Sequence, residues 1–128
     1  MATVEMTFDN FEQIIDENDI VMIDFWAEWC GPCKAFGPIF EDASGRHEDV
    51  VFAKVDTETQ QQLAAAFNVR SIPMVVVFRG QVPVYGQPGM LPAEAIDDLL
   101  TQARELDVEK IREEHQRLVE EHQSQHSN

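Results

Sequence analysis

Cysteines and basic residues are both scarce in this sequence of 128 residues, and each shortage excludes a class of protein. The only two cysteines, Cys30 and Cys33, leave no further pair for a scaffold of structural disulfides, which favours a reducing cytoplasm. Nine Lys and Arg stand against 24 Asp and Glu, and the formal net charge of -15 argues against nucleic acid or anionic membrane as a partner. We see no apolar run long enough to cross a bilayer, and the N-terminus does not resemble a signal peptide.

Both cysteines belong to one short element, Cys-Gly-Pro-Cys, that directly follows an apolar run at residues 21–26. This run is rich in Val, Ile and Phe and is typical of a buried strand. The pattern predicts strand, turn and helix, with the helix beginning near Cys30. The unpaired N–H groups and the positive dipole end of that helix favour a thiolate on Cys30, which becomes the nucleophile. Cys33, one turn further into the helix, is shielded and acts as the resolving thiol.

A zinc site and a structural disulfide are the two alternatives for this cysteine pair. Zinc needs two further ligands, and the remaining candidates are histidines that lie mostly in a polar tail: His47, His115, His122 and His126. A disulfide that spans two residues closes too small a loop to stabilise the chain much. The sequence therefore favours a redox-active dithiol and no metal.

Residues 7–100 resemble the thioredoxin family, and the segment DFWAEWCGPCK at residues 24–34 is close to the family's most specific signature. Three more features support the resemblance: a proline inside the helix after the cysteines, an Ile-Pro pair before a Val-rich strand, and a glycine before the last helix of the domain, at Pro38, Ile72, Pro73 and Gly89. The resemblance implies the thioredoxin fold, an α/β fold with a central mixed β-sheet flanked by helices. It also implies a protein-disulfide reductase that needs no cofactor besides its Cys30–Cys33 disulfide.

The resemblance further implies a mechanism. Cys30 attacks a disulfide of a protein substrate, and Cys33 then attacks the mixed disulfide and releases the reduced substrate. Asp24 matches a buried carboxyl with a raised pKa that takes the proton of Cys33, and Lys54 matches a lysine that tunes this carboxyl. On the residues alone, Asp24 also fits a strand end that reaches water or an amide. Lys54 fits a solvated strand lysine equally well.

Substrate binding is expected in a shallow groove beside the disulfide. Trp29 offers exposed apolar surface, and in the family the backbone before a cis-proline pairs with an extended substrate segment as an added strand. The groove residues that we predict are Trp29, Gly31, Pro32, Ile72, Pro73 and Gly89. The partners implied are protein disulfide substrates and an NADPH-dependent flavoprotein reductase.

Alternating patterns predict the order of the elements. Strands are expected at residues 3–6, 21–26, 50–56, 74–79 and 81–85, and helices at residues 9–16, 30–44, 58–67 and 92–103. Pro83 interrupts the last strand and fits only the edge of a sheet. Together these elements predict a thioredoxin domain over residues 1–104.

Residues 105–128 form an acidic extension that ordinary thioredoxins lack. Its apolar residues fall on a helical stripe interrupted by His115, at Val108, Ile111, Leu118 and Val119. We expect a helix that packs on its own domain or is partly frayed, with dimerisation or docking of a client as the alternative. The sequence HQSQHSN at residues 122–128 predicts a disordered tail.

The residue after the Ile-Pro pair is a second departure from the family. Met74 follows the Ile-Pro pair where most family members have threonine, and its flexible thioether is expected to soften the groove.

The main functional alternative is a binding or chaperone module that holds clients in its groove and extension, and a disulfide isomerase is a lesser one. The intact cysteine pair argues against a binding module. Gly-Pro between the cysteines resembles reductases with potentials near -270 mV rather than oxidases near -120 mV.

Overall fold

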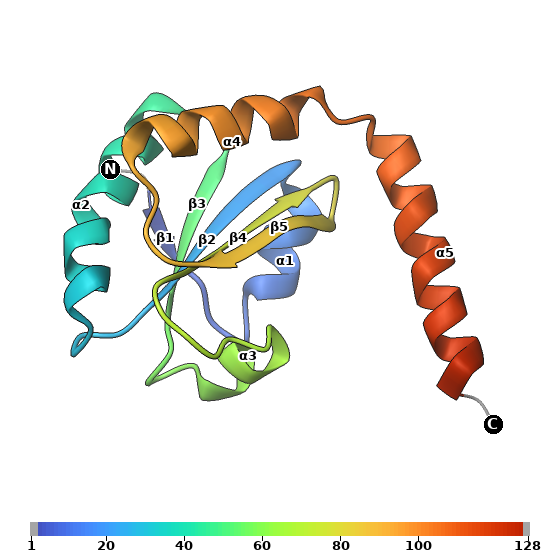
Figure 1. Ribbon diagram of the computed structural model, residues 1–128, viewed down its shortest axis with the longest axis horizontal. Helices are drawn as coiled ribbons and strands as arrows, with labels where there is room; N and C mark the ends of the chain where they lie inside the picture. Colours follow the sequence, from blue (N-terminus) through green and yellow to red (C-terminus); the bar gives the residue numbers. More distant parts are fainter. Residues whose placement is uncertain (1–2, 127–128) are drawn as a thin grey trace.

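The chain folds around one mixed sheet of five strands, and the computed structural model describes residues 3–126 (Figure 1). The strands are β1 (Thr3–Glu5), β2 (Ile20–Trp26), β3 (Val51–Asp56), β4 (Met74–Arg79) and β5 (Val82–Pro88). They lie in the order β1-β3-β2-β4-β5; β3 is parallel to β1 and β2, and β4 is antiparallel to β2 and β5. The helices are α1 (Phe11–Glu17), α2 (Gly31–Arg46), α3 (Gln61–Ala66), α4 (Ala93–Glu105) and α5 (Val108–His126). The predicted order of elements is confirmed, and most bounds shift by one to three residues.

The central strand β2 separates two apolar cores, because successive side chains of a strand point to opposite faces. Ile20 and Met22 join the core that includes α2 and α4, with Phe36, Phe40, Ile96 and Leu100. Val21, Ile23 and Phe25 join the core on the other face, with Ile15 of α1 and Leu63 of α3. Asp24 is in phase with Ile20 and Met22. Its side chain therefore projects from the face that α2 covers.

β5 forms one edge of the sheet, which confirms the position expected from its proline. Phe78 of β4 pairs with Pro83, whereas Val77 pairs with Tyr85. Val84 is therefore an extra residue on the edge strand, as in a β-bulge. A proline and a bulge together make this edge a poor template for a further strand.

A two-residue turn, Gly80–Gln81, joins β4 to β5 and also holds the base of α5. Both turn residues have positive φ, 58° at Gly80 and 68° at Gln81, as in the hairpin turns that match the twist of a sheet. Arg112 donates through Nε to the Gly80 carbonyl oxygen at 2.9 Å and through a terminal nitrogen to the Gln81 side chain. A Cβ on Gly80 would lie 2.6 Å from Cγ1 of Val108, so only glycine fits here.

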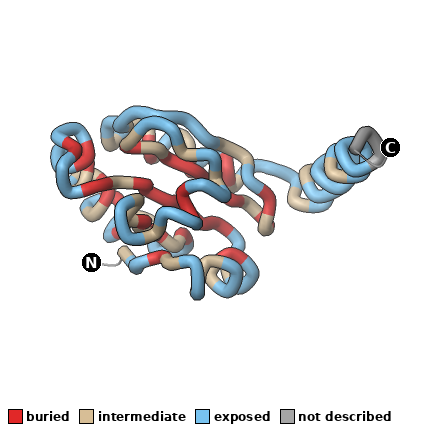
Figure 2. The backbone as a smooth tube through the Cα atoms, turned by 90° about the horizontal axis from the view of Figure 1, so that it is seen from below, coloured by how far each residue is buried: buried red, intermediate tan, exposed pale blue. Residues whose placement is uncertain are grey.

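Beyond this attachment α5 leaves the domain and stands at its side (Figure 1). The exposed helix is visible at the end of the chain in Figure 2. The expected helix is confirmed, but its packing on the domain is limited to its first turns. The helix α5 continues to His126, so the disordered tail that was predicted from residue 122 is helical up to that residue. Residues 127–128 of the predicted tail lie outside the described residues. No helix among residues 3–126 has the length and apolar character needed to cross a membrane.

Replacing Gly80 with alanine should destabilise the chain by about 1–3 kcal/mol, because the new Cβ meets Val108 and the backbone retains a positive φ. Urea unfolding measures the loss. Limited trypsin digestion should cut faster after Arg112, which is anchored to the turn in the native chain. Gly45→Ala is the matched control, since a Cβ there meets nothing within 4 Å. Equal stability of the two variants would show that the Val108 contact does not hold α5.

Candidate active site

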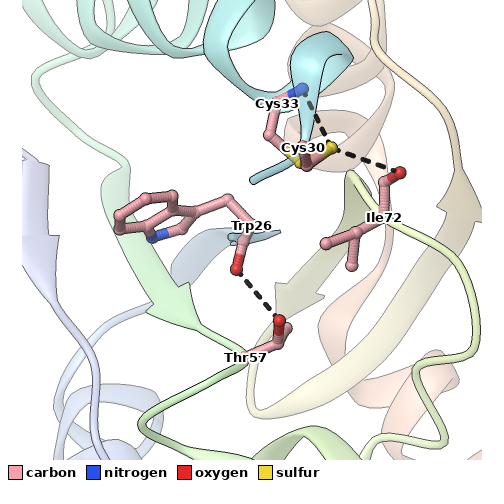
Figure 3. Close-up of a disulfide and its surroundings, with 5 residues drawn as sticks. All are labelled: Trp26, Cys30, Cys33, Thr57 and Ile72. Atoms are coloured by element: carbon pink, nitrogen blue, oxygen red, sulfur yellow. Dashed lines mark hydrogen bonds between the residues drawn. A yellow bond between two sulfur atoms is a disulfide. The ribbon is translucent and has the colours of Figure 1, made fainter. Parts of the chain in front are cut away.

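The disulfide Cys30–Cys33 lies at the N-terminus of α2, directly after the central strand (Figure 3). Cys30 is the N-cap residue, with extended backbone angles of -89° and 112°, and Cys33 belongs to the first turn. The backbone N–H of Cys33 donates to Sγ of Cys30 at 3.2 Å. Both cysteines are only 4% exposed, so burial does not distinguish them. Their positions in α2 distinguish them, because Sγ of Cys30 accepts a hydrogen bond from an otherwise unpaired N–H group of the helix.

A loop from another part of the chain covers the sulfur of Cys30. The Ile72 carbonyl oxygen lies 3.8 Å from Sγ of Cys30, and the peptide bond between Ile72 and Pro73 is cis, as the resemblance implied. The N–H of Gly89 donates to the Pro73 carbonyl oxygen at 2.7 Å. Gly89 has a φ of 104°, which favours glycine even though a side chain would have room. The fold thus brings the end of β5 to the loop that faces the disulfide.

A hollow of about 250 Å³ lies beside this loop. Trp29 forms one wall and is 69% exposed. The other lining residues come from distant segments: Thr57, Ala64, Val69, Arg70, Ser71 and Ile72. Trp29 and Ile72 were predicted for the groove from the sequence. The other five were not, because a hollow between segments that are far apart in the chain leaves no local pattern.

Asp24 is fully buried, and neither of its carboxylate oxygens has a hydrogen-bond partner among residues 3–126. Burial raises the pKa of Asp24 from its ordinary value of 3.8 to about 7, against a smaller lowering by the charge of Lys54. The strand-end alternative, in which Asp24 reaches water or an amide, is wrong. This carboxyl can take up or release a proton near neutral pH.

Lys54 lies next to Asp24 because β2 and β3 pair these two residues in register. Its Nζ lies 5.1 Å from the centre of the Trp26 ring, in a cation–π contact. It also lines a hollow of about 440 Å³ beside the edge strand β1. Oγ1 of Thr57 donates to the Trp26 carbonyl oxygen at 3.1 Å (Figure 3). The backbone N–H of Thr57 donates to the same oxygen at 2.9 Å, and the two bonds fix the end of β2. Lys54 therefore lies beside Asp24 in the sheet and also lines a surface hollow.

Two further residues that were predicted for the groove lie at the start of α2. Gly31 and Pro32 are exposed in the first turn of α2. Met74 packs against the same core as Ile72, and it lines a hollow with Phe67 and Gly86 rather than the hollow beside Trp29. Within residues 3–126, we find no group of three or more His, Cys, Asp or Glu placed to hold a metal ion.

Comparison with known proteins agrees with the family resemblance seen in the sequence. The sequence profile of the family described as Thioredoxin matches residues 2–102. A Streptomyces coelicolor protein that carries the name thioredoxin 2 is 53% identical over 111 residues, which cover 87% of this chain and 83% of that protein. The structure of a mutant thioredoxin from Halobacterium salinarum superposes with a TM-score of 0.75 at 31% identity, over 82% of this chain and 92% of that one. A bifunctional thioredoxin reductase/thioredoxin of Mycobacterium leprae is 40% identical over 85 residues, 65% of this chain and 19% of that protein.

A disulfide at a helix N-terminus, opposite a cis-proline loop on a mixed sheet, defines a thiol–disulfide oxidoreductase. The chain belongs to the thioredoxin family. It is a protein-disulfide reductase of the thioredoxin type, and its redox pair is Cys30 and Cys33.

Proposed function

We propose that Cys30 is the nucleophile and Cys33 the resolving thiol of this reductase. The thiolate of Cys30 attacks a substrate disulfide; a bond forms between Cys30 and one substrate sulfur, and the other leaves as a thiolate. Cys33 loses its proton and attacks Cys30, which forms the Cys30–Cys33 disulfide and releases the second substrate thiolate. Two electrons pass to the substrate. The observation that supports these roles is the N–H of Cys33 donated to Sγ of Cys30 at 3.2 Å.

We propose that Asp24 accepts the proton of Cys33 and that Lys54 adjusts its basicity. A carboxyl with a pKa of about 7 is matched to proton transfer at neutral pH, since a useful general base titrates near the working pH. Asp24 projects from the face of the sheet that α2 covers, and Cys33 lies in the first turn of α2. Lys54 faces both this carboxyl and the hollow at β1, and so lies where it can assist exchange of the proton with water.

We propose that protein substrates dock along Trp29, the Ile72–Pro73 loop and Gly89, with Gly31 and Pro32 at the rim. Exposed aromatic surface next to a buried reactive sulfur gives contact area without covering the sulfur. We expect backbone groups of the loop before β4 to pair with an extended segment of the substrate. The side chains that line the hollow beside Trp29 then contact the residues that flank the substrate disulfide.

The partner that restores the dithiol is proposed to be an NADPH-dependent flavoprotein reductase, in a reducing cytoplasm. The Mycobacterium leprae relative, whose name joins a thioredoxin reductase to a thioredoxin, supports this pairing. The redox domain is proposed to end near residue 104, with residues 105–128 as an extension. The exposed helix α5 is the feature that would favour client binding in addition to disulfide reduction.

Replacing Cys33 with serine should trap mixed disulfides, because Cys30 still attacks but nothing resolves the product. Incubation with insulin, followed by non-reducing electrophoresis, should show a covalent adduct of the 128-residue chain that dithiothreitol removes. The double variant Cys30→Ser/Cys33→Ser is the control and should form none. Capture of insulin that is equal for both variants and resists dithiothreitol would favour a non-covalent binding module.

A further inference from the structure

The helix α5 and the edge strand β5 enclose an apolar hollow that the redox chemistry does not use. Its volume is about 320 Å³, and it is lined by Val82, Pro83, Val84, Leu106, Ile111, Glu114, His115 and Leu118. A smaller hollow of about 190 Å³, between β5 and the end of α4, shares Val84 and Leu106 with it. Leu118 is 63% exposed, and Leu106 is 36% exposed. Because the two hollows share these two residues, we treat them together and call them the β5–α5 surface.

The β5–α5 surface has a fixed base. Arg112 donates to the Gly80 carbonyl oxygen at 2.9 Å, and Val108 packs on the same turn. The stripe of α5 that faces β5 repeats at spacings of four and three residues, at Ile111, His115 and Leu118. Such a spacing presents side chains to a neighbouring helix in a two-helix contact. The base of α5 is therefore fixed, and its stripe lies beside the apolar residues of β5, where a second helix can pack.

The charges on the rim indicate what kind of helix fits. Glu114 lines the hollow, and Glu121, seven residues further, lies on the same side of α5. Arg112 is already engaged at the turn. A second copy of the chain would bring the same two acidic residues and a further charge of -15 to the contact, so self-pairing is disfavoured. An extended strand is disfavoured too, because Pro83 and the bulge at Val84 interrupt the pairing edge of β5.

We propose that the β5–α5 surface binds an amphipathic helix of another protein, with apolar side chains on one face and Lys or Arg beside them. Two or three apolar side chains of that helix fill the hollow against Ile111, Leu118 and Val84. Its basic residues lie against Glu114 and Glu121. This is recognition of a helix in a groove, and it is independent of the cysteine pair.

The test uses the full 128-residue chain and a fluorescent helical peptide made only of Leu and Lys, with Leu on one face. Anisotropy at about 0.15 M salt, where charges are screened beyond about 8 Å, measures the dissociation constant. Leu118→Gln should weaken binding about tenfold, since it removes one apolar contact. Glu114→Gln should weaken it about threefold, since it removes one charge attraction at the rim. Glu113→Gln, which removes the same charge from the outer face of α5, should leave it unchanged.

Three results would overturn the proposal. One is no binding of the Leu/Lys peptide, or equal binding of a peptide with the same composition but Leu spread around the helix. The second is an equal effect of Glu113→Gln and Glu114→Gln, which indicates unspecific charge attraction. The third is self-association of the native chain in analytical ultracentrifugation that Leu118→Gln abolishes, since the occupant would then be a second copy. Insulin reduction by each variant should match the native chain and shows that the variant is folded.

Discussion

Replacing Cys30 with serine should reduce the rate of insulin disulfide reduction to that of dithiothreitol alone, a loss of more than about a hundredfold. Serine is nearly isosteric, so the N-cap position and the first turn of α2 should form as before. What disappears is the sulfur that receives the Cys33 N–H and forms the mixed disulfide. Precipitation of the insulin B chain, followed by turbidity, measures the rate.

The controls for this experiment separate chemistry from folding. Circular dichroism should show the same secondary structure for Cys30→Ser and for the reduced native chain. Ser44→Ala is a suitable comparison variant, because Ser44 lies in the same helix, is 2% exposed and is more than two turns from the disulfide. Its rate should stay within about twofold of the native rate. A Cys30→Ser variant that still reduces insulin well above the background would assign the attack to Cys33 and contradict the proposed roles.

Replacing Asp24 with asparagine should stabilise the oxidised chain at pH 8 by up to about 4 kcal/mol and change it little at pH 4. The rise of the folded-state pKa from 3.8 to about 7 corresponds to about 4 kcal/mol against the ionised folded state. Between these pH values the folded chain binds more protons than the unfolded chain does. The stability of the native chain therefore falls as the pH rises from about 4 to about 7, and the asparagine variant lacks this loss.

Urea unfolding of both chains at pH 4 and pH 8 measures this difference. The amide of asparagine also lacks a partner in this site, so the gain at pH 8 is expected below the full value. Asp16→Asn removes an exposed carboxylate of α1 and should show no such dependence on pH. In the reductase assay Asp24→Asn should slow resolution of the mixed disulfide at pH 7. Equal stability changes at pH 4 and pH 8 would show that folding does not raise the pKa of Asp24.

Local sequence was sufficient for the elements that hold the cysteines. The apolar run before Cys30 predicts the central strand, and Gly31 and Pro32 predict the start of α2 at the place where the structure has it. The alternation around Asp24 identified a carboxyl in a buried strand, which is an exception costly enough to stand out. The prediction for Lys54 rested on the resemblance, because the pairing of β2 with β3 joins residues 30 positions apart.

Contacts between distant segments were out of reach of the sequence. Arg70 and Thr57 join the hollow at Trp29 only through the fold. The effect of Met74 on the groove stays a prediction, and Met74 does not line the hollow beside Trp29. In the structure, β4 starts at Met74 and the alternation of the strand turns this side chain toward Phe67. The stripe on α5 was visible in the sequence, but the turn at Gly80 decides where that helix attaches.

The anchor of α5 and the disulfide lie at opposite ends of the central strand. Gly80 donates its N–H to the Asp19 carbonyl oxygen just before β2 begins, whereas Cys30 follows shortly after β2 ends. Seven residues of strand separate the two ends by about 23 Å. A protein held at α5 would therefore not cover the disulfide, and its own disulfide could reach Cys30 on a flexible segment. Such tethering sets an effective concentration near millimolar for short linkers, so clients would be selected by linker length as well as by the groove.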